Sequence, residues 1–434
     1  MMLNLSGVMV IKRLLSVSLF LFYIIVGFGQ KLVSGPILLP KNDSCDTHWL
    51  LIKKKKAIRF ESNVKLTVQE DTVVNHFFKR KRAYQLFVSK KLNSSYYLKV
   101  YNHKDDLLFH KIYEKHHPSN NSYLFGSCAF IPHGITSIYR PTKMNKIYRT
   151  MSKENAHKMF WLGDNVYLFP NVDTEKLVRI YRRYLGVRKD RSLKMFLSSG
   201  VEHHAIWDDH DFGPNNASGL FNNVGLTTLA FKSFWNKFNL KQDSGIYEVL
   251  KTNNIDFFLL DCRTFLKVKK GSFLGNTQLN WLKKELAQSN AKFKFLLFSN
   301  QVINPKTNHE TINRGLFKKE KEELFNFIQK KKINGVIFFS GDRHFAELHV
   351  DDTKNYPLYD FTTSPLSSPR HHLFFKKEKK NTATRVVGSF FTNKNYLKCT
   401  LKEQNNLSLL FFELKNKHGK PVFKLQLSEK DLGH

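Results

Sequence analysis

The sequence predicts an α/β protein in which a large α/β part follows a small all-β N-terminal domain. Three patterns support this prediction. Apolar residues tend to alternate from about residue 32 to residue 118, buried strand-like runs then alternate with amphipathic segments, and a strand–turn–strand pattern returns from about residue 386. A chain of 434 residues with 41% hydrophobic and 14% aromatic residues is long and apolar enough for a globular core, which excludes a disordered protein.

The N-terminus has the features of an export signal. Lys12 and Arg13 precede the apolar run "LLSVSLFLFYIIVGFG", which ends in small residues before Gln30. This pattern predicts a signal peptide over residues 1–29, with a short membrane anchor as the alternative. We therefore expect an exported protein, which would be periplasmic, secreted or held at the cell surface. The four cysteines form no compact framework, and we expect no disulfide core.

Residues 30–118 are predicted to form a β-sandwich-like domain, because stretches such as "RAYQLFVSK" and "SSYYLKVYN" alternate. The stretch "KHHPSNNS" (115–122) has the composition of a linker. Residues 119–434 would then form the catalytic domain with C-terminal β-strands. Its expected strands are "SYLFGS", "KMFWLG", "HAIWDD", "DFFLLD", "KFLLFS" and "GVIFFSG". Its expected helices are "TEKLVRIYRRYL", "TTLAFKSFWNKF", "TQLNWLKKEL" and "KEKEELFNFIQKKK".

Polar residues follow almost every expected strand, where open α/β sheets place their sites. These clusters are "GSC", "GDNVY", "WDDHD", "LDCR", "SNQ" and "SGDRH". The chain has 70 Lys+Arg against 36 Asp+Glu and a formal charge of +34, so the crowding of three aspartates in "WDDHD" is unusual. Carboxylates, histidine, a thiol and a phenol at one rim are the donors of a metal site, and cations would neutralise the crowded aspartates.

The ordered set "GSC", "LGDNVY", "WDDHDFGPNN", "LDCRTF", "TQLNWL", "FSNQV" and "SGDRHFAEL" resembles the alkaline phosphatase D-type (PhoD-like) metallophosphatases. The resemblance runs from about residue 123 to the C-terminus. It implies a four-layer α/β/β/α metallophosphoesterase sandwich, export, and hydrolysis of phosphate monoesters and diesters by a metal-activated hydroxide.

The resemblance also implies two or more metal ions, with Fe³⁺ and Ca²⁺ as the expected cofactors. Asp164 would bridge two of them. The other ligands that the resemblance implies are Cys128, Tyr167, Asp209, Asn216, Asp342 and His344. Cys128 and Tyr167 would bind the ferric ion. The usual opening motif "DxH" of phosphoesterases is replaced here by "GSC", which leaves the identity of the second metal open.

Three further residues are candidates for catalysis. His210 would contact the phosphate and protonate the leaving group, while Arg263 and Arg343 would meet phosphate oxygens. The remaining polar and aromatic residues of these motifs are interpreted as structural: Ser127, His203, His204, Trp207, Gln278 and Trp281. Asp208 and Asp211 would cap turns or orient His210.

We therefore expect an exported metal-dependent phosphoesterase that acts as a monomer, without a specific nucleic-acid partner. Its positive charge should also attract it peripherally to anionic surfaces. The sequence is compatible with a monoester, a diester, a teichoic-acid-like polymer or a phospholipid as the substrate. The alternative is a non-catalytic basic surface protein that binds polyanions, favoured by the +34 charge alone.

Overall fold

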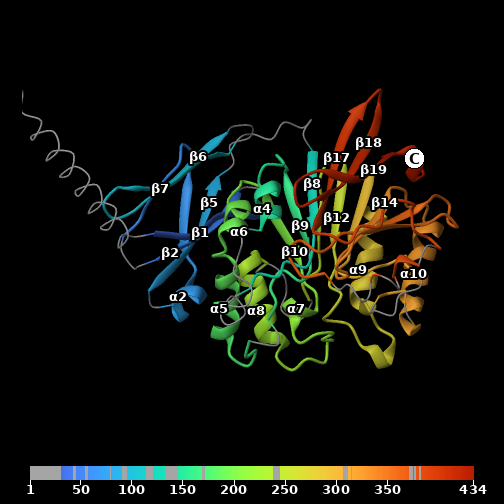
Figure 1. The fold of residues 1–434 in the computed structure, drawn as a ribbon, viewed down its shortest axis with the longest axis horizontal. Coiled ribbons are helices and arrows are strands. Elements are labelled where there is room, and N and C mark those ends of the chain that lie inside the picture. Colours follow the sequence, from blue (N-terminus) through green and yellow to red (C-terminus); the bar gives the residue numbers. More distant parts are fainter. Residues whose placement is uncertain are drawn as a thin grey trace, which may run out of the picture.

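The fold is taken from a computed structural model (Figure 1) that describes residues 31–42, 45–53, 57–78, 80–89, 95–113, 121–132, 145–168, 172–237, 245–305, 311–313, 315–370, 375, 378–380 and 383–434. The expected signal peptide over residues 1–29 and most of the expected linker over 115–122 lie outside these ranges. Among the helices that are described, none combines the length and the hydropathy needed to cross a bilayer.

The N-terminal region consists mainly of strands. One sheet has the order β1-β2-β5-β4 and a second has the order β3-β6-β7. Their bounds are β1 (Lys31–Asn42), β2 (Cys45–Lys53), β3 (Arg59–Glu61), β4 (Leu66–Glu70), β5 (Lys81–Ser89), β6 (Tyr96–Tyr101) and β7 (Leu107–Tyr113). Alternate residues of these strands, including Leu50, Leu86 and Leu98, form a separate apolar cluster. The alternation in the sequence therefore predicted the strands correctly.

One helix in this region was not predicted. Helix α2 (Thr72–Phe77) lies between β4 and β5, and the Asp71 side chain accepts a hydrogen bond from the backbone N–H of Val74 at 3.0 Å. The helix has only six residues, which is too short for a visible apolar stripe. The region is therefore not built from strands alone.

Two six-stranded sheets form the larger part of the chain. The first has the order β10-β9-β8-β17-β18-β19, and the second has the order β11-β12-β13-β14-β16-β15. In the first, β8 to β10 are parallel and β17 to β19 are antiparallel. In the second, β12, β13, β14 and β16 are parallel, and antiparallel strands lie at both edges.

These strands are β8 (Asn121–Gly126), β9 (Lys158–Leu162), β10 (Glu202–Ile206), β11 (Glu248–Leu250), β12 (Ile255–Leu259), β13 (Phe293–Leu297), β14 (Val336–Ser340), β15 (Glu347–Asp351), β16 (Leu358–Thr362), β17 (Asn395–Gln404), β18 (Leu407–Asn416) and β19 (Pro421–Ser428). The six runs read from the sequence correspond to β8, β9, β10, β12, β13 and β14, and the pattern from about residue 386 corresponds to β17, β18 and β19. Strands β11, β15 and β16 were not predicted. Every residue of β9, β10, β12, β13 and β14 is buried, as expected for strands covered on both faces.

The two large sheets pack face to face through aromatic side chains. The ring of Phe125 on β8 stacks on Phe339 of β14 with centroids 4.2 Å apart, and Phe160 of β9 stacks on Phe257 of β12 at 4.4 Å. The loops that follow β8 and β16 also meet, because the N–H of Leu366 donates to the carbonyl of Ser127 at 2.8 Å. Strands of both sheets therefore end at one rim.

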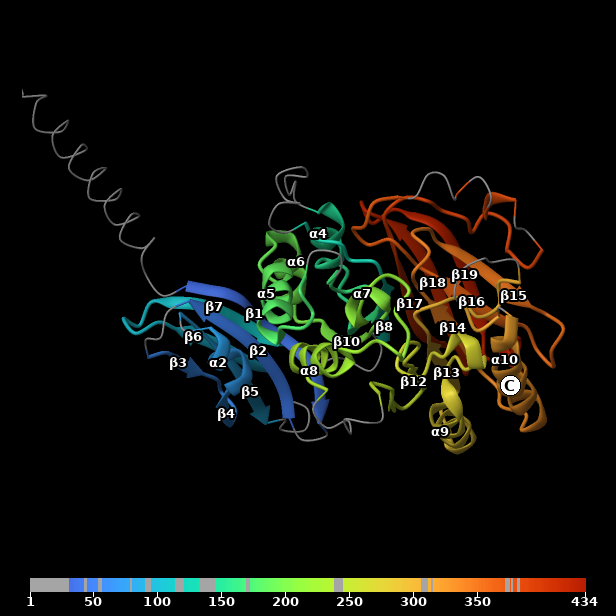
Figure 2. The same cartoon turned by 90° about the horizontal axis from the view of Figure 1, so that it is seen from below.

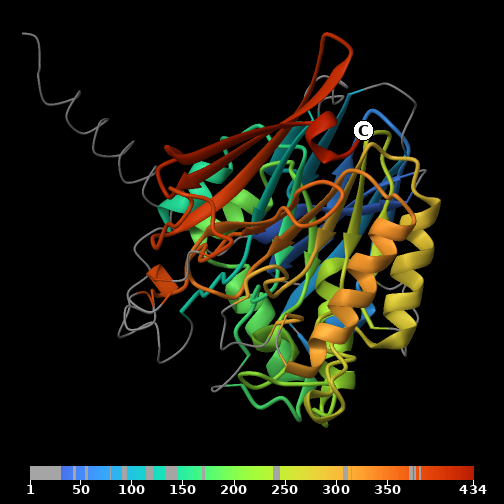
Figure 3. The ribbon, with the colours of Figure 1, turned by 90° about the vertical axis from the view of Figure 1, so that its right-hand side faces the viewer.

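The helices of this part of the chain are α4 (Lys146–Met151), α5 (Leu177–Val187), α6 (Arg191–Leu197), α7 (Asp209–Phe212), α8 (Val224–Trp235), α9 (Gly275–Gln288) and α10 (Lys318–Lys330). The short α7 lies at the rim, just after β10. Figure 2 shows α5, α6 and α8 between the N-terminal strands and the first large sheet, while α9 and α10 lie at the other end of the molecule. Figure 3 shows α9 and α10 side by side on the outer face of the second sheet.

Candidate metal centre

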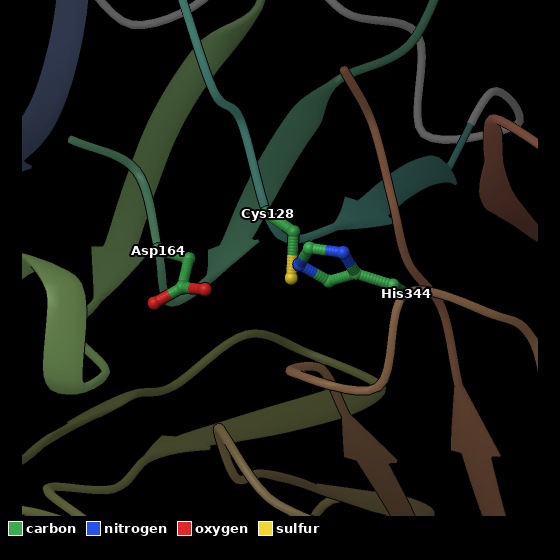
Figure 4. A group of neighbouring side chains, drawn as sticks. All are labelled: Cys128, Asp164 and His344. Atoms are coloured by element: carbon green, nitrogen blue, oxygen red, sulfur yellow. The ribbon is translucent and has the colours of Figure 1, made fainter. Parts of the chain in front are cut away.

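The polar clusters predicted from the sequence meet where the two large sheets end. Cys128 follows β8, Asp164 follows β9, and His344 follows β14. Figure 4 shows these three side chains pointing toward one another. Their ligand atoms all lie within 4.8 Å of one another, and all three residues are buried. One thiol, one carboxylate and one imidazole at this spacing form a set that can hold a single metal ion.

A second group shares one carboxylate with the first. The ligand atoms of Asp164, Asp209 and His210 also lie within 4.8 Å of one another. The Asp209 carboxylate is held by two backbone N–H donors, from His210 at 2.9 Å and from Asn216 at 2.7 Å. Asp164 is thus the member common to both groups, the position that a bridging ligand would need.

The backbone at these positions is unusual. Cys128, Asp164, Asp342 and His344 have φ values of 58°, 54°, 65° and 57°. Residues other than glycine rarely adopt this left-handed backbone conformation, and those that do cluster at functional sites. The strained backbone of each such residue costs about 1–3 kcal/mol of stability. The loops are tied together, because the N–H of Cys128 donates to the carbonyl of Gly163 at 3.2 Å.

Hydrogen bonds fix the orientation of the candidate ligands. The Nδ1–H of His344 donates to the carbonyl of Pro369 at 2.7 Å, which leaves the lone pair of the neutral ring on Nε2. The Tyr167 hydroxyl lies 3.0 Å from Asp164 Oδ2 and 2.8 Å from the Ser368 hydroxyl. The ring of Tyr167 stacks on the ring of His210 with centroids 4.2 Å apart.

The protein alone does not balance the charges of this site. Burial, followed by repulsion from Asp209 and Asp208, raises the pKa of Asp164 well above its usual value. In addition, Asp164 Oδ1 is buried without a hydrogen-bond partner. Burial and the neighbouring Asp164 also raise the pKa of the Cys128 thiol and of the Tyr167 phenol. A bound cation reverses this situation by stabilising the thiolate, the phenolate and the carboxylates. The residues therefore fit a metal centre.

Asp208 and Asp211 hold the loops, as the sequence suggested. They form a capping box at the start of α7, and Asp211 also accepts the N–H groups of Asn165 and Val166 at 3.1 and 2.8 Å. These bonds connect the loop after β10 to the loop after β9. Gly163, the first residue after β9, has φ 94°, and an added Cβ at this position would come within 2.6 Å of the Asp208 side chain.

The two predicted phosphate-binding arginines are buried and paired with carboxylates. Arg263 Nε donates to Asp208 Oδ1 at 2.6 Å, and Arg343 donates to Glu378 at 2.6 Å. Arg343 Nε is buried without a hydrogen-bond partner. Asn216 is exposed, and it contacts the site through its backbone N–H bond to Asp209.

The two histidines that precede Ala205 belong to the first large sheet. His203 and His204 lie inside β10, and both are buried. His204 is 2.8 Å from Glu202, which also pairs with Lys158 at 2.7 Å. The expected run "HAIWDD" began at His204 because Glu202 and His203 are polar, whereas the strand begins at Glu202.

Sequence reasoning missed the loop after β16. Pro369 and Ser368 contact His344 and Tyr167, and the Ser368 hydroxyl also donates to the carbonyl of Cys128 at 2.9 Å. The signal was available as "TTSPLSSP", which follows the buried run of β16 in the same way that the other clusters follow their strands.

Comparisons with known proteins agree with this geometry. Residues 125–409 match the family of PhoD-like phosphatases. The chain is 24% identical over 290 residues to alkaline phosphatase D of Bacillus subtilis (strain 168), an alignment that covers 54% of this chain and 48% of that protein. The chain therefore spans about half the length of the curated relative it matches.

A solved structure, described as the structure of PhoD, is similar with a TM-score of 0.63 at 17% identity, and the match covers 92% of this chain and 88% of that chain. This likeness concerns the fold, a mixed α/β arrangement of several sheets.

Proposed function

The chain belongs to the PhoD-like phosphatase family, and from that membership and the two ligand groups we propose that it is an exported metal-dependent phosphoesterase. The observation that carries the proposal is the position of Asp164, whose carboxylate is common to both groups. A shared carboxylate between two candidate cation positions is the arrangement that two-metal hydrolases need. The substrate would be a phosphate ester, either a monoester or a diester.

We assign the ligands by their chemistry. Cys128, Tyr167 and His344 provide a thiolate, a phenolate and an imidazole, which suit a ferric ion together with Asp164. Asp209 and Asp342 provide the oxygen donors that Ca²⁺ prefers, with Asn216 as a further candidate. When bound, the cations would polarise the phosphoryl oxygens and make a nearby water more acidic.

The protein's own residues would position the ester and move one proton. His210 is held by ring stacking on Tyr167, and its Nδ1 is buried without a hydrogen-bond partner. In this position it can donate a proton to the leaving-group oxygen. Arg343, whose Nε also lacks a partner, would meet an equatorial phosphate oxygen. Arg263 would act mainly through its ion pair with Asp208.

We interpret the two packed sheets with helices outside them as a four-layer α/β/β/α sandwich over residues 119–434. Residues 30–118 would form the separate N-terminal domain, and residues 1–29 would be removed on export. The apolar cluster between the two N-terminal sheets supports this boundary, and the other face of the first of these sheets, with Trp49 and Leu51, packs against the main core. Sequencing the N-terminus of the exported protein tests the cleavage before Gln30.

Phosphate release tests the proposed activity. Purified protein is assayed on a nitrophenyl phosphate monoester, the matching diester, a teichoic-acid-like polymer and a phospholipid. Asp164→Asn is the inactive variant, and Asp352→Asn is the matched control because Asp352 is exposed. We expect hydrolysis by the wild type and by the control. No hydrolysis of any ester by metal-loaded protein, combined with retention on an anionic polymer, would favour the non-catalytic alternative.

A further inference from the structure

Three exposed apolar side chains lie on loops at the rim where the large sheets end. Leu220, Val268 and Leu316 are 74%, 53% and 56% exposed, and we call them the rim patch. Leu220 follows α7, Val268 follows β12, and Leu316 lies just before α10 in the segment after β13. A single exposed apolar side chain is ordinary, whereas several that gather in one place mark an interaction surface.

Backbone contacts join these three loops into one surface. The N–H of Gly219 in the first loop donates to the carbonyl of Leu266 in the second at 3.0 Å. An added Cβ at Gly271 would lie 2.5 Å from the Leu316 Cβ, so the second loop also packs against the third. Figure 1 shows the chain between β12 and α9, in yellow, at the lower edge of the molecule, the side on which α7 lies. The rim patch is therefore continuous.

The rim patch adjoins the candidate metal centre. Arg263 Nη1 donates to the carbonyl of Ala217 at 3.3 Å, while Arg263 Nε pairs with Asp208 at 2.6 Å. The N–H of Asn216 donates to the Asp209 carboxylate at 2.7 Å. The loops that display the patch are thus bonded directly to Asp208 and Asp209. A surface docked on the patch would lie beside the centre.

The segments that carry the patch contain basic residues and no acidic ones. Residues 213–223, 264–272 and 311–319 have no Asp or Glu. Glu320, which follows the last of these segments, is buried and accepts the N–H of Leu274 at 2.6 Å. Each lysine close to an anionic membrane surface contributes about fivefold in affinity. The exposed lysines of the three segments are Lys267, Lys269, Lys270, Lys318 and Lys319.

This composition fits an anionic bilayer better than a dissolved polyanion. A dissolved polyanion would contact the lysines and leave the three apolar side chains in water. Apolar side chains that project separately can each enter a lipid interface without a complementary cavity, while the lysines remain at the level of the headgroups.

We propose that the rim patch docks the protein on an anionic lipid bilayer. Leu220, Val268 and Leu316 enter the interface, and the lysines of the same loops contact the headgroup phosphates. Docking brings the candidate metal centre to the lipid headgroups. The inference goes beyond the proposed function, because docking requires no turnover.

Vesicle sedimentation without an ester tests the docking. Exported protein is mixed with vesicles of phosphatidylglycerol and phosphatidylcholine, or of phosphatidylcholine alone, and we expect stronger binding to the anionic vesicles. Leu220→Ser, Val268→Ser and Leu316→Ser combined should weaken that binding at least ~10-fold, because burial of one such side chain already contributes about that much. Lys318→Gln with Lys319→Gln should weaken it about 10–30-fold, and less at high salt.

Matched control variants lie away from the rim. Leu107→Ser with Ile112→Ser changes two side chains of β7 that are 54% and 58% exposed. Lys330→Gln with Lys331→Gln changes two exposed lysines at the other end of α10. Both control variants should bind vesicles as the wild type does, and thermal melts show whether every variant is folded. Equal vesicle binding by the triple serine variant and the wild type overturns the proposal.

Two further measurements separate the patch from other routes of binding. If the lysine variant loses polyphosphate and vesicle binding equally while the serine variant changes neither, the surface binds polyanions and the docking proposal falls. Leu316→Trp reports on the patch itself, because brominated lipids should quench its added fluorescence but not that of Ile112→Trp. Vesicle-bound protein without this quenching binds through another segment, which also contradicts the proposal.

The result is distinguishable from a failure of the proposed function. Vesicle binding that depends on the rim patch, in protein that hydrolyses no ester, supports docking and contradicts the enzyme assignment. Hydrolysis of nitrophenyl esters by protein that binds no vesicles has the opposite meaning.

Discussion

Replacing Asp342 by asparagine should stabilise the metal-free protein at alkaline pH. Burial, followed by repulsion from Asp208, raises the pKa of Asp342 to about 7 in the folded chain, against 3.8 as the ordinary value. A raised carboxyl pKa means that ionisation opposes folding. The cost is absent below pH 3.8, grows between pH 3.8 and 7, and is complete above pH 7. The difference between these two pKa values, about 3, corresponds to about 4 kcal/mol in the free energy of unfolding.

Asparagine has the same shape, tolerates the positive φ of this position and carries no charge. With an unfolding entropy of about 2.1 cal/mol/K per residue, 434 residues give about 0.9 kcal/mol/K, so the Tm should rise by about 4 °C. Thermal melts of wild type and Asp342→Asn in chelator, at pH 4.5 and pH 8, measure this increase. We expect the gain to be largest at pH 8 and small at pH 4.5. A variant that is less stable than the wild type at pH 8 without metal would refute the reasoning.

Three further predictions concern the reaction and the metal. Asp164→Asn should abolish phosphate release while the protein stays folded, because it removes the carboxylate common to both groups without changing the size of the side chain. Equal activity of the metal-loaded variant and the wild type would contradict the bridging role. His210→Ala should lower turnover by about 10²–10⁴-fold for esters with poor leaving groups and much less for nitrophenyl esters, since a general acid matters least when the leaving group is a stable anion. A uniform decrease would instead make His210 a ligand or a phosphate contact. Purified protein should be coloured, because charge transfer from the Cys128 thiolate and the Tyr167 phenolate to Fe³⁺ gives a visible absorption band. Cys128→Ser and Tyr167→Phe should each shift or remove this band. A colourless, active protein without iron would contradict the ferric assignment.

The central strands and the site loops were predictable because each leaves a simple signal. Buried parallel strands such as β9 and β14 are continuous apolar runs, and each ends in a polar cluster that has to lie at the rim. The order of these clusters then identified Cys128, Asp164 and His344, which the structure brings together. Local patterning was sufficient here because position along a parallel strand determines which end of the sheet a residue reaches.

Other features depend on contacts between distant segments and leave no local signal. The start of β10 is hidden because Glu202 and His204 are polar residues that satisfy each other and Lys158 inside the core. The contact of Pro369 with His344 joins loops that follow different strands. The unsatisfied oxygen of Asp208 became visible only after the partners of its other oxygen, Arg263 and Ser299, had been located.

The most direct test of the metal-dependent phosphoesterase is phosphate release by one preparation before chelation, after chelation and after metals are returned. The account predicts that purified protein contains bound metal by elemental analysis, that chelation abolishes hydrolysis of the nitrophenyl ester, and that Fe³⁺ and Ca²⁺ together restore it. Full activity after chelation, in protein shown to contain no metal, would contradict the assignment of Cys128, Asp164, Asp209 and His344 as the ligands on which hydrolysis depends.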